Sequence, residues 1–461
     1  MSIIAGFLLP HPACSIPQIG KGDEDIIFKT LSSIQKVADR IAALKPDTIV
    51  VISAHAEAYS DYFQISDGDV AIGSLAKYEA YDVTFRNYYD REFVKALCAF
   101  CHNENVLAGI DGENHHYLDH GTMIPLYFIN QKYRSYNLVR VGVSGLPLID
   151  HYKLGQMIKK TANELNRKVV VIASGELSHC LNGDAPYGYN PIGQKYDARF
   201  NKMLTTGNFL DLFSFNEDML ESSKQCCHRV MTIMAGALDK TAVTSTLLSY
   251  EGQLGTGFSV AEFEVKESDS SRAFGDIYLN NESTYVAKKK ETEDDYVSLA
   301  RKAIENFVNT GKRLRLPSKL PSEMIEAQKG VFITIREKGA LRGCLGSAKG
   351  LTRNVAQEII SNSMKAAAED PRFNPITKDE LAYLTITVSV VDNLMEVKSV
   401  TDLDPNQYGL VVEFGEKHAT LLPGLSTVHT TAEQLALAKR KAGIMQDDKC
   451  RLYRFSVEKH E

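Results

Sequence analysis

Four short apolar runs in the first part of the chain show no alternation of polar and apolar positions. Such runs, rich in β-branched residues, are typical of strands buried on both faces of a parallel sheet. They cover residues 3–9, 48–53, 138–143 and 169–173. Apolar residues recur at helical spacing over residues 24–44, 91–101, 154–165, 198–212 and 227–239. This alternation predicts an α/β domain with a mostly parallel sheet and helices on both faces.

The pattern changes near residue 286, where a run of charged residues predicts a solvated linker over 286–293 and the start of a new helix. Beyond it, predicted strands and helices follow one another without regular alternation, which favours an α+β domain. The predicted helices cover 296–309 and 351–368, the predicted strands 331–337 and 384–391, and a hairpin 409–414 and 418–422. With 461 residues the chain is too long for one hydrophobic core. We therefore expect domains over 1–285 and 294–461.

Composition narrows the choice of partners and location. The formal net charge of -6 provides no general electrostatic reason to bind nucleic acid or an anionic membrane. No apolar stretch is long enough to span a bilayer, and no signal peptide pattern opens the chain. The eight cysteines form no dense framework, so reduced thiols and a cytoplasmic location are expected.

Candidate metal ligands follow three of the predicted strands. His11 follows the first, His55 the second, and Glu176 and His179 the run 169–173. A single histidine at a strand end is more often a hydrogen-bonded structural residue than a ligand. Parallel strands, however, bring their carboxyl ends to one edge of the sheet, where sites of open α/β folds lie. Imidazoles with an anionic third ligand suit Fe(II), Mn or Zn.

More histidines lie in a polar region before an apolar run, 123–128, that predicts another strand. His120 follows Asp119, and a neutral imidazole beside a metal-bound substrate can move a proton near neutral pH. His115 and His116 precede it in a polar loop. They either line the same cleft or are solvated surface residues, and the sequence leaves both interpretations open.

These motifs resemble the LigB-type class III extradiol dioxygenase superfamily, which includes the Memo proteins, over about the first 280 residues. The matching segments are Leu9-Pro10-His11-Pro12, Ser53-Ala54-His55, Asp119-His120-Gly121, Ser174-Gly175-Glu176-Leu177-Ser178-His179 and Cys226-Cys227-His228-Arg229. The resemblance implies that His11 and His55 bind the metal, and that His120 and His179 face the substrate as acid/base groups. Many relatives have Asp where this chain has Glu176.

The resemblance assigns the third metal ligand to Cys226. Ring-cleaving members use a glutamate at this place, whereas Memo-like members have a cysteine; Glu221 and Cys227 are the alternatives in this chain. A thiolate favours Zn or Cu(I) more than a carboxylate does. Fe(II) is the expected metal, with Zn or Cu as alternatives.

The second domain contains an unusual segment, Leu341-Arg342-Gly343-Cys344-Leu345-Gly346-Ser347, which we expect to be a short loop. Glycine there permits positive φ or the close approach of a ligand. The segment is either a hairpin turn with an incidental thiol, or a site in which Arg342 favours the thiolate of Cys344. It resembles the signature of the AMMECR family, and the resemblance extends over 294–461. That family implies a fold and a ligand-binding face, without a settled reaction.

The fusion of the two domains resembles the AmmeMemoRadiSam set, in which both accompany a radical SAM enzyme. This resemblance implies a cytoplasmic, metal-dependent redox protein with a radical SAM partner. The first hypothesis is an Fe(II) enzyme of extradiol-dioxygenase type acting on an aromatic or enediol-like substrate. The second is a non-enzymatic metal-binding or scaffold module for the radical SAM partner. The third is a Zn hydrolase that uses the same cleft.

Overall fold

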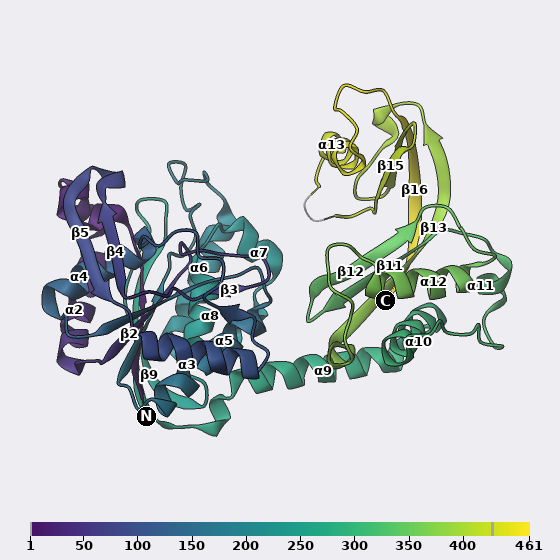
Figure 1. Ribbon diagram of the computed structural model, residues 1–461. Coiled ribbons are helices and arrows are strands. Elements are labelled where there is room, and N and C mark those ends of the chain that lie inside the picture. The colour runs from purple at the N-terminus through teal and green to yellow at the C-terminus, as the bar shows by residue number, and fades with distance from the viewer. Residues whose placement is uncertain (1, 426–427) are drawn as a thin grey trace. The chain divides into compact units, whose positions relative to one another are not determined.

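The computed structural model describes residues 2–425 and 428–461. It divides the chain into two compact units, an N-terminal unit over Met1–Tyr278 and a C-terminal unit over Leu279–Glu461 (Figure 1). Each unit has its own sheet of six strands.

The sheet of the N-terminal unit has the strand order β7-β2-β8-β1-β10-β9. Its four parallel strands are β7 (Asn137–Gly142), β2 (Thr48–Ser53), β8 (Val169–Ser174) and β1 (Ile3–Leu9). At its other edge, β10 (Phe258–Ser268) runs antiparallel to β1, and β9 (Thr241–Glu251) antiparallel to β10. Strands β2 and β8 are buried at every position, which explains their unbroken apolar runs. The predicted α/β class and mostly parallel sheet are confirmed.

Helices cover both faces of this sheet (Figure 1). On one face α2 (Phe28–Leu44) packs against α4 (His120–Lys132) over a core that includes Phe7 and Val51. On the other face α3 (Arg91–Asn103), α5 (Leu148–Glu164) and α8 (Cys227–Ala237) pack in succession. The smaller elements of the unit are α1 (Pro17–Gly20), β3 (Phe63–Gln64), β4 (Val70–Leu75), β5 (Ala80–Tyr88), β6 (Ala108–Gly109) and α7 (Glu217–Ser222).

The apolar run 123–128, predicted as a strand, lies in helix α4, so that prediction is wrong. The helix starts after Asp119, whose carboxylate accepts a hydrogen bond from the Thr122 backbone N–H at 3.0 Å. Every residue from Gly121 to Ile129 except Tyr127 is buried, so this part of the helix has no polar face and no helical periodicity. A short apolar run cannot distinguish a buried helix from a buried strand.

Helix α6 (Pro191–Thr206) begins and ends several residues earlier than the predicted range 198–212. The side chain of Asn190 caps its start, and Pro191 at the first position is preorganised for a helix. Gly207, with a φ of 65°, ends it in the left-handed region that glycine adopts without strain.

The C-terminal unit has an antiparallel sheet in the order β12-β11-β13-β16-β14-β15. Its strands are β11 (Val331–Glu337), β12 (Ala340–Ser347), β13 (Leu384–Val397), β14 (Gly409–Phe414), β15 (Lys417–Leu421) and β16 (Arg451–His460). Helices α10 (Asp295–Thr310) and α12 (Val355–Ala368) cover one part of the sheet, and α13 (Thr431–Ala442) packs on the β14–β15 hairpin. A short helix, α11 (Ser322–Glu326), packs beside α12. The predicted α+β class is confirmed.

One expectation for this part of the chain, the loop over 341–347, is wrong. The predicted linker 286–293 is helical as far as Thr292, because it continues α9 (Phe274–Thr292), and most of its residues are exposed. Its Lys and Glu residues are good helix formers, and Lys289 and Lys290 suit the negative end of the helix dipole. The segment 341–347, predicted as a loop, belongs to strand β12.

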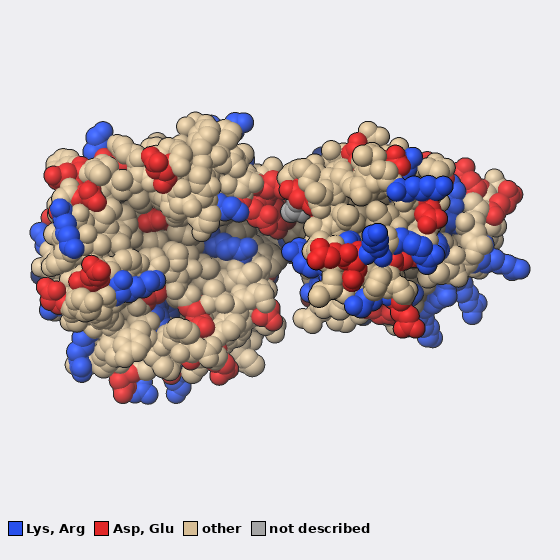
Figure 2. Space-filling model, turned by 90° about the horizontal axis from the view of Figure 1, so that it is seen from above, with Lys and Arg blue, Asp and Glu red and all other residues tan. Residues whose placement is uncertain are grey.

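Among the described residues, no helix combines the length and the apolar character that crossing a bilayer requires. Acidic and basic side chains are interspersed over the face of the molecule seen in Figure 2.

Candidate metal centre

Three imidazoles converge where the parallel strands of the N-terminal unit end. His11 and His55 each lie two residues beyond β1 and β2, and His120 is the first residue of α4. The Nε2 atoms of His11 and His55 are 3.0 Å apart. The ring of His120 lies 5.2 Å from that of His11 and 4.1 Å from that of His55, measured between centroids. The strand-end positions predicted from the sequence therefore do meet at one edge of the sheet.

The hydrogen bonds of Ser174 determine which nitrogen of His11 carries a proton. Ser174, the last residue of β8, donates its hydroxyl proton to the Gly121 carbonyl. The Ser174 oxygen must then accept from His11 Nδ1, which is 3.0 Å away. His11 Nε2 is left unprotonated, and its lone pair faces His55 Nε2 at hydrogen-bond distance. Metal-binding imidazoles are held in this manner by a partner on the other ring nitrogen.

Of the three candidates for a third ligand, Cys226 is the one that faces the imidazoles. Its Sγ lies 3.8 Å from His11 Nε2, and ligand atoms of His11, His55 and Cys226 all lie within 4.8 Å of one another. Cys227 is buried with its Sγ 3.3 Å from the Tyr196 hydroxyl. Glu221, on α7, belongs to neither group of converging ligand atoms in the described part of the chain.

A carboxylate lies beside the same thiol. Glu176 Oε2 accepts a hydrogen bond from His179 Nε2 at 3.0 Å, and Oε1 lies 4.0 Å from His11 Nε2. Glu176, His179 and Cys226 form a second group with ligand atoms within 4.8 Å. Burial raises the pKa of Glu176, but the neighbouring His11 and His179 outweigh it and lower this pKa to about 2. Glu176 is therefore ionised at neutral pH.

Burial keeps the three imidazoles neutral. It lowers the pKa of His11 to about 4, and also lowers the pKa values of His55 and His120. Burial and the charge of Glu176 raise the pKa of the Cys226 thiol, so a bound cation would have to displace its proton. Neutral imidazoles, a thiol and one carboxylate match the ligands that Fe(II), Zn and Cu prefer in proteins. The residues present thus fit a transition metal.

Asp119 positions His120 and connects it to the sheet. Its Oδ1 accepts from the hydroxyl of Ser53, at the end of β2, at 2.6 Å. A Cβ at Gly121 would lie 2.5 Å from that hydroxyl oxygen, so glycine is needed for this close approach. Sequence analysis did not identify Ser53 and Ser174 as functional. They are paired directly across β2 and β8, and a serine ending each of two neighbouring strands is the signal that could have found them.

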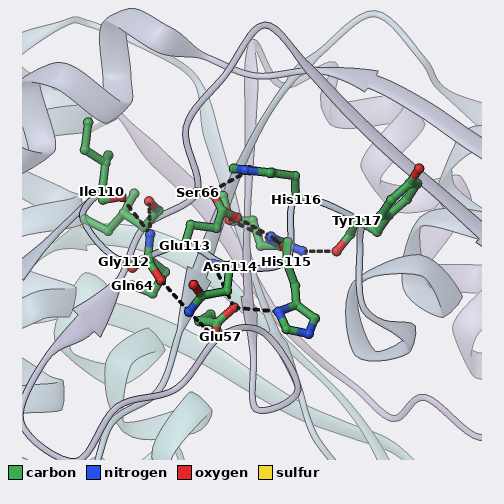
Figure 3. Close-up of polar contacts among 12 residues, drawn as sticks. Glu57, Gln64, Ser66, Ile110, Gly112, Glu113, Asn114, His115, His116 and Tyr117 are labelled. Carbon is green, nitrogen blue, oxygen red and sulfur yellow. Dashed lines mark hydrogen bonds and ion pairs between the residues drawn. The ribbon is translucent and has the colours of Figure 1, made fainter.

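The loop that carries His115 and His116 is held by buried Arg140 of β7. The Arg140 guanidinium donates to the Tyr117 carbonyl at 2.9 Å and pairs with Glu113. His115 turns toward Glu57, with its Nδ1 3.4 Å from the carboxylate, and its side chain is 82% exposed (Figure 3). His116 is 76% exposed. Both are solvated surface residues.

In the C-terminal unit, Arg342 and Cys344 have different partners. Arg342 is the extra residue of a β-bulge in β12, and its Nε pairs with Glu380 at 2.5 Å. Near Cys344 the guanidinium is that of Arg372, which donates to the Cys344 carbonyl at 3.3 Å. Cys344 Sγ lies 3.3 Å from the Thr334 hydroxyl.

The two glycines of this segment are explained by packing. Gly343 and Gly346 both have negative or extended backbone angles outside the left-handed region. A Cβ at Gly343 would lie 2.3 Å from the Ala366 carbonyl of α12, and one at Gly346 would lie 2.2 Å from the Val331 carbonyl. The close approach that glycine permits here is that of the chain's own backbone.

Comparison with known proteins identifies two families along the chain. Residues 5–261 match the family model described as the catalytic LigB subunit of aromatic ring-opening dioxygenase. Residues 297–460 match the AMMECR1 family model.

One similar protein matches this chain over its full length. Protein CA_C1420 of Clostridium acetobutylicum is 35% identical over 471 aligned positions, covering 100% of both chains. A protein of Thermotoga maritima is 39% identical over 37% of this chain and 98% of its own. Among solved structures, uncharacterized protein PH0010 from Pyrococcus horikoshii is 30% identical over 37% of this chain and 91% of its own, with a TM-score of 0.35. Uncharacterized protein JW3007 from Escherichia coli is 16% identical over 56% of this chain and 99% of its own, with a TM-score of 0.37.

Proposed function

The chain belongs to the family of the catalytic LigB subunit of aromatic ring-opening dioxygenase, followed by an AMMECR1 domain, and on this premise we propose that it is an Fe(II)-dependent oxidoreductase of extradiol-dioxygenase type. The observation that carries the proposal is the unprotonated Nε2 of His11, whose lone pair faces His55 and Cys226. The substrate we propose is a small aromatic diol or an enediol-like compound. A radical SAM enzyme in the cytoplasm is the proposed partner, on the resemblance of the two-domain arrangement.

His11, His55 and Cys226 would hold the metal, and Glu176 would bind weakly or orient the site. When bound, Fe(II) would supply the chemistry that activates O2 for reaction with the diol. Neutral His120 would take or return a proton of the substrate. His179 would do the same, and Glu176 supports it because an imidazolium there would lie 3.0 Å from the carboxylate.

Anaerobic metal analysis tests the metal site. The purified protein should contain about one Fe per chain, and the His11→Ala and His55→Ala variants should contain none, because each loses a ligand. His116→Ala is the matched control, because His116 is exposed and should leave the metal content unchanged. Circular dichroism checks that all variants are folded. Metal retained in both ligand variants refutes the site.

Cobalt substitution tests the third ligand. A Co(II)–thiolate bond produces charge-transfer absorption in the near ultraviolet that imidazole and carboxylate ligands do not. We expect this band in the Co(II)-loaded protein, its loss in Cys226→Ser and its retention in Cys227→Ser. Cys226 is not a ligand if the band is lost only in Cys227→Ser, or if the unmodified protein shows no band.

One observation favours a second function. According to the resemblance, ring-cleaving relatives use a glutamate at the position of Cys226. The cysteine in its place favours a non-enzymatic metal-binding or scaffold module for the radical SAM partner. O2 consumption with several catechols discriminates, because uptake that depends on His120 supports the dioxygenase. If no diol causes uptake and the radical SAM partner is recovered in pull-downs, the scaffold is supported. Zn in place of Fe would favour the hydrolase.

A further inference from the structure

The C-terminal unit contains a large cavity that the proposed dioxygenase site does not use. Its volume is about 920 Å³, and its walls come from strands of the sheet, the segment after β15 and helix α13. Sites for small molecules and cofactors have volumes of about 300–1,000 Å³. The cavity is therefore large enough for a ligand of cofactor size.

The lining of the cavity is strongly basic. Six basic side chains contribute to it, against the two acidic side chains of Glu413 and Glu461; the basic residues are Arg336, Lys349, Arg372, Arg440, Lys441 and Lys459. The chain as a whole has a net charge of -6, so this excess of positive charge is local. Clefts lined by one sign of charge concentrate ligands of the opposite sign.

Part of this positive charge is not neutralised by the protein, although Arg372 pairs with Asp370 at 2.7 Å. Glu413 is shared between Lys349, at 3.7 Å, and Arg451, at 3.3 Å. Within the described ranges 2–425 and 428–461, no carboxylate lies within ion-pair distance of Arg440 or Lys459. Unpaired cations that line one cavity repel one another, and a bound anion would relieve that repulsion.

The rest of the lining is apolar and aromatic. Residues of this kind come from five strands and from the segment after β15: Phe332, Leu345, Leu394, Val411, Leu422 and Tyr453. Phe332 also lies parallel to Phe455, with ring centroids 6.3 Å apart, in the same hydrophobic cluster. A simple inorganic ion would leave this apolar surface wet, whereas a flat organic body would cover it.

Cys344 contributes its side chain to the same wall. Hydrogen bonds hold its backbone on both sides, since Asp370 accepts from the Cys344 N–H at 2.8 Å and Arg372 donates to its carbonyl at 3.3 Å. The thiol therefore has a defined position beside the Arg372 guanidinium, and its reactivity reports on the charge of the cavity.

We propose that this cavity binds a small organic anion with a flat apolar or aromatic body and at least one acidic group, either carboxylate or phosphate. The basic rim would pair with the acidic group, and the apolar wall would cover the body. This site is independent of the metal centre in the N-terminal unit, and its test does not require metal.

Fluorescent probes of matched shape test the charge requirement in the full-length protein. Anilinonaphthalene sulfonate has an aromatic body and one negative charge, and N-phenyl-1-naphthylamine has a similar body without charge. We expect the Arg440→Gln/Lys459→Gln double variant to weaken sulfonate binding about tenfold and to leave binding of the neutral probe unchanged. The control is Lys302→Gln/Lys378→Gln, which removes two exposed charges outside the cavity lining. Equal sulfonate binding by all three proteins overturns the proposal.

Displacement of the sulfonate probe identifies the acidic group. Displacement by naphthyl phosphate and not by naphthoate assigns a phosphate, and the reverse assigns a carboxylate. If neutral naphthol displaces the probe as well as both anions do, the site does not select anions and the proposal is wrong.

Alkylation of Cys344 provides a second readout. We expect the rate ratio of iodoacetate to iodoacetamide, measured by peptide mass spectrometry, to be at least about fivefold higher at Cys344 than at Cys450. Cys450 lies in the same unit and does not line the cavity. The difference should become smaller in the Arg440→Gln/Lys459→Gln variant. The same ratio at both thiols of the unmodified protein contradicts the proposal.

Discussion

Replacing Ser174 by alanine should weaken metal binding although Ser174 is not a proposed ligand. In the folded protein the Ser174 oxygen accepts from His11 Nδ1 and its hydroxyl donates to the Gly121 carbonyl. Ser174→Ala removes the acceptor that keeps the proton on Nδ1. The proton then moves to Nε2 in part of the molecules, and those molecules have no lone pair for the metal.

The expected loss of metal affinity follows from the role of Ser174 as the hydrogen-bond partner of a proposed ligand, His11. Loss of a partner that orients a metal-binding imidazole costs about 10- to 100-fold in metal affinity, or about 1.4–2.7 kcal/mol. Stability falls as well, because Ser174 is fully buried and its loss leaves a buried carbonyl and a buried N–H without a partner. An unsatisfied buried group of this kind costs about 1–3 kcal/mol.

Competition with a chelating dye under anaerobic conditions measures the affinity, and urea denaturation of the metal-free protein measures the stability. Ser178→Ala is the matched control. Ser178 lies in the segment that follows β8, and its hydroxyl oxygen is buried without a hydrogen-bond partner in the described part of the chain. Its removal should change the metal affinity by less than about twofold.

One result would refute this reasoning. If Ser174→Ala binds metal as tightly as the unmodified protein while His11→Ala binds none, His11 is a ligand but Ser174 does not control its tautomer. If Ser174→Ala and Ser178→Ala weaken binding equally, the effect comes from general loosening of the segment.

Two further predictions concern stability. Burial raises the pKa of Asp197 to about 6, above its unfolded value near 3.8. The protonated Asp197 carboxyl therefore stabilises the folded protein below about pH 4, relative to neutral pH. This contribution is lost as the pH rises through 6. From pH 4 to 7.5 the unmodified metal-free protein should therefore lose about 3 kcal/mol relative to Asp197→Asn, at 1.36 kcal/mol for each pKa unit; parallel pH profiles in urea denaturation contradict this. Gly155→Ala should cost about 3 kcal/mol or more, because its Cβ would lie 1.9 Å from the Ile233 carbonyl across the α5–α8 contact. Gly183→Ala, with open space around it, should cost less than about 1 kcal/mol, and equal losses would show that the helix contact tolerates separation.

The sequence by itself determined the class of both domains and the edge at which His11 and His55 meet. Both follow from local patterns, since unbroken apolar runs report burial on both faces, and parallel strands end at the same edge. The nature of the run 123–128 could not be determined in this way, because burial on all sides removes the periodicity that distinguishes a helix from a strand.

The tertiary structure alone decided which side chains face one another. Cys226 and Cys227 are adjacent in the sequence, but the start of α8 turns one toward His11 and the other toward Tyr196. Arg342 is two residues from Cys344, but a bulge in β12 directs it to Glu380. Such choices depend on contacts between segments far apart in the chain, and local periodicity carries no information about them. The basic cavity was also decided by the tertiary structure alone, because its walls come from strands and a helix that only the folded sheet brings together.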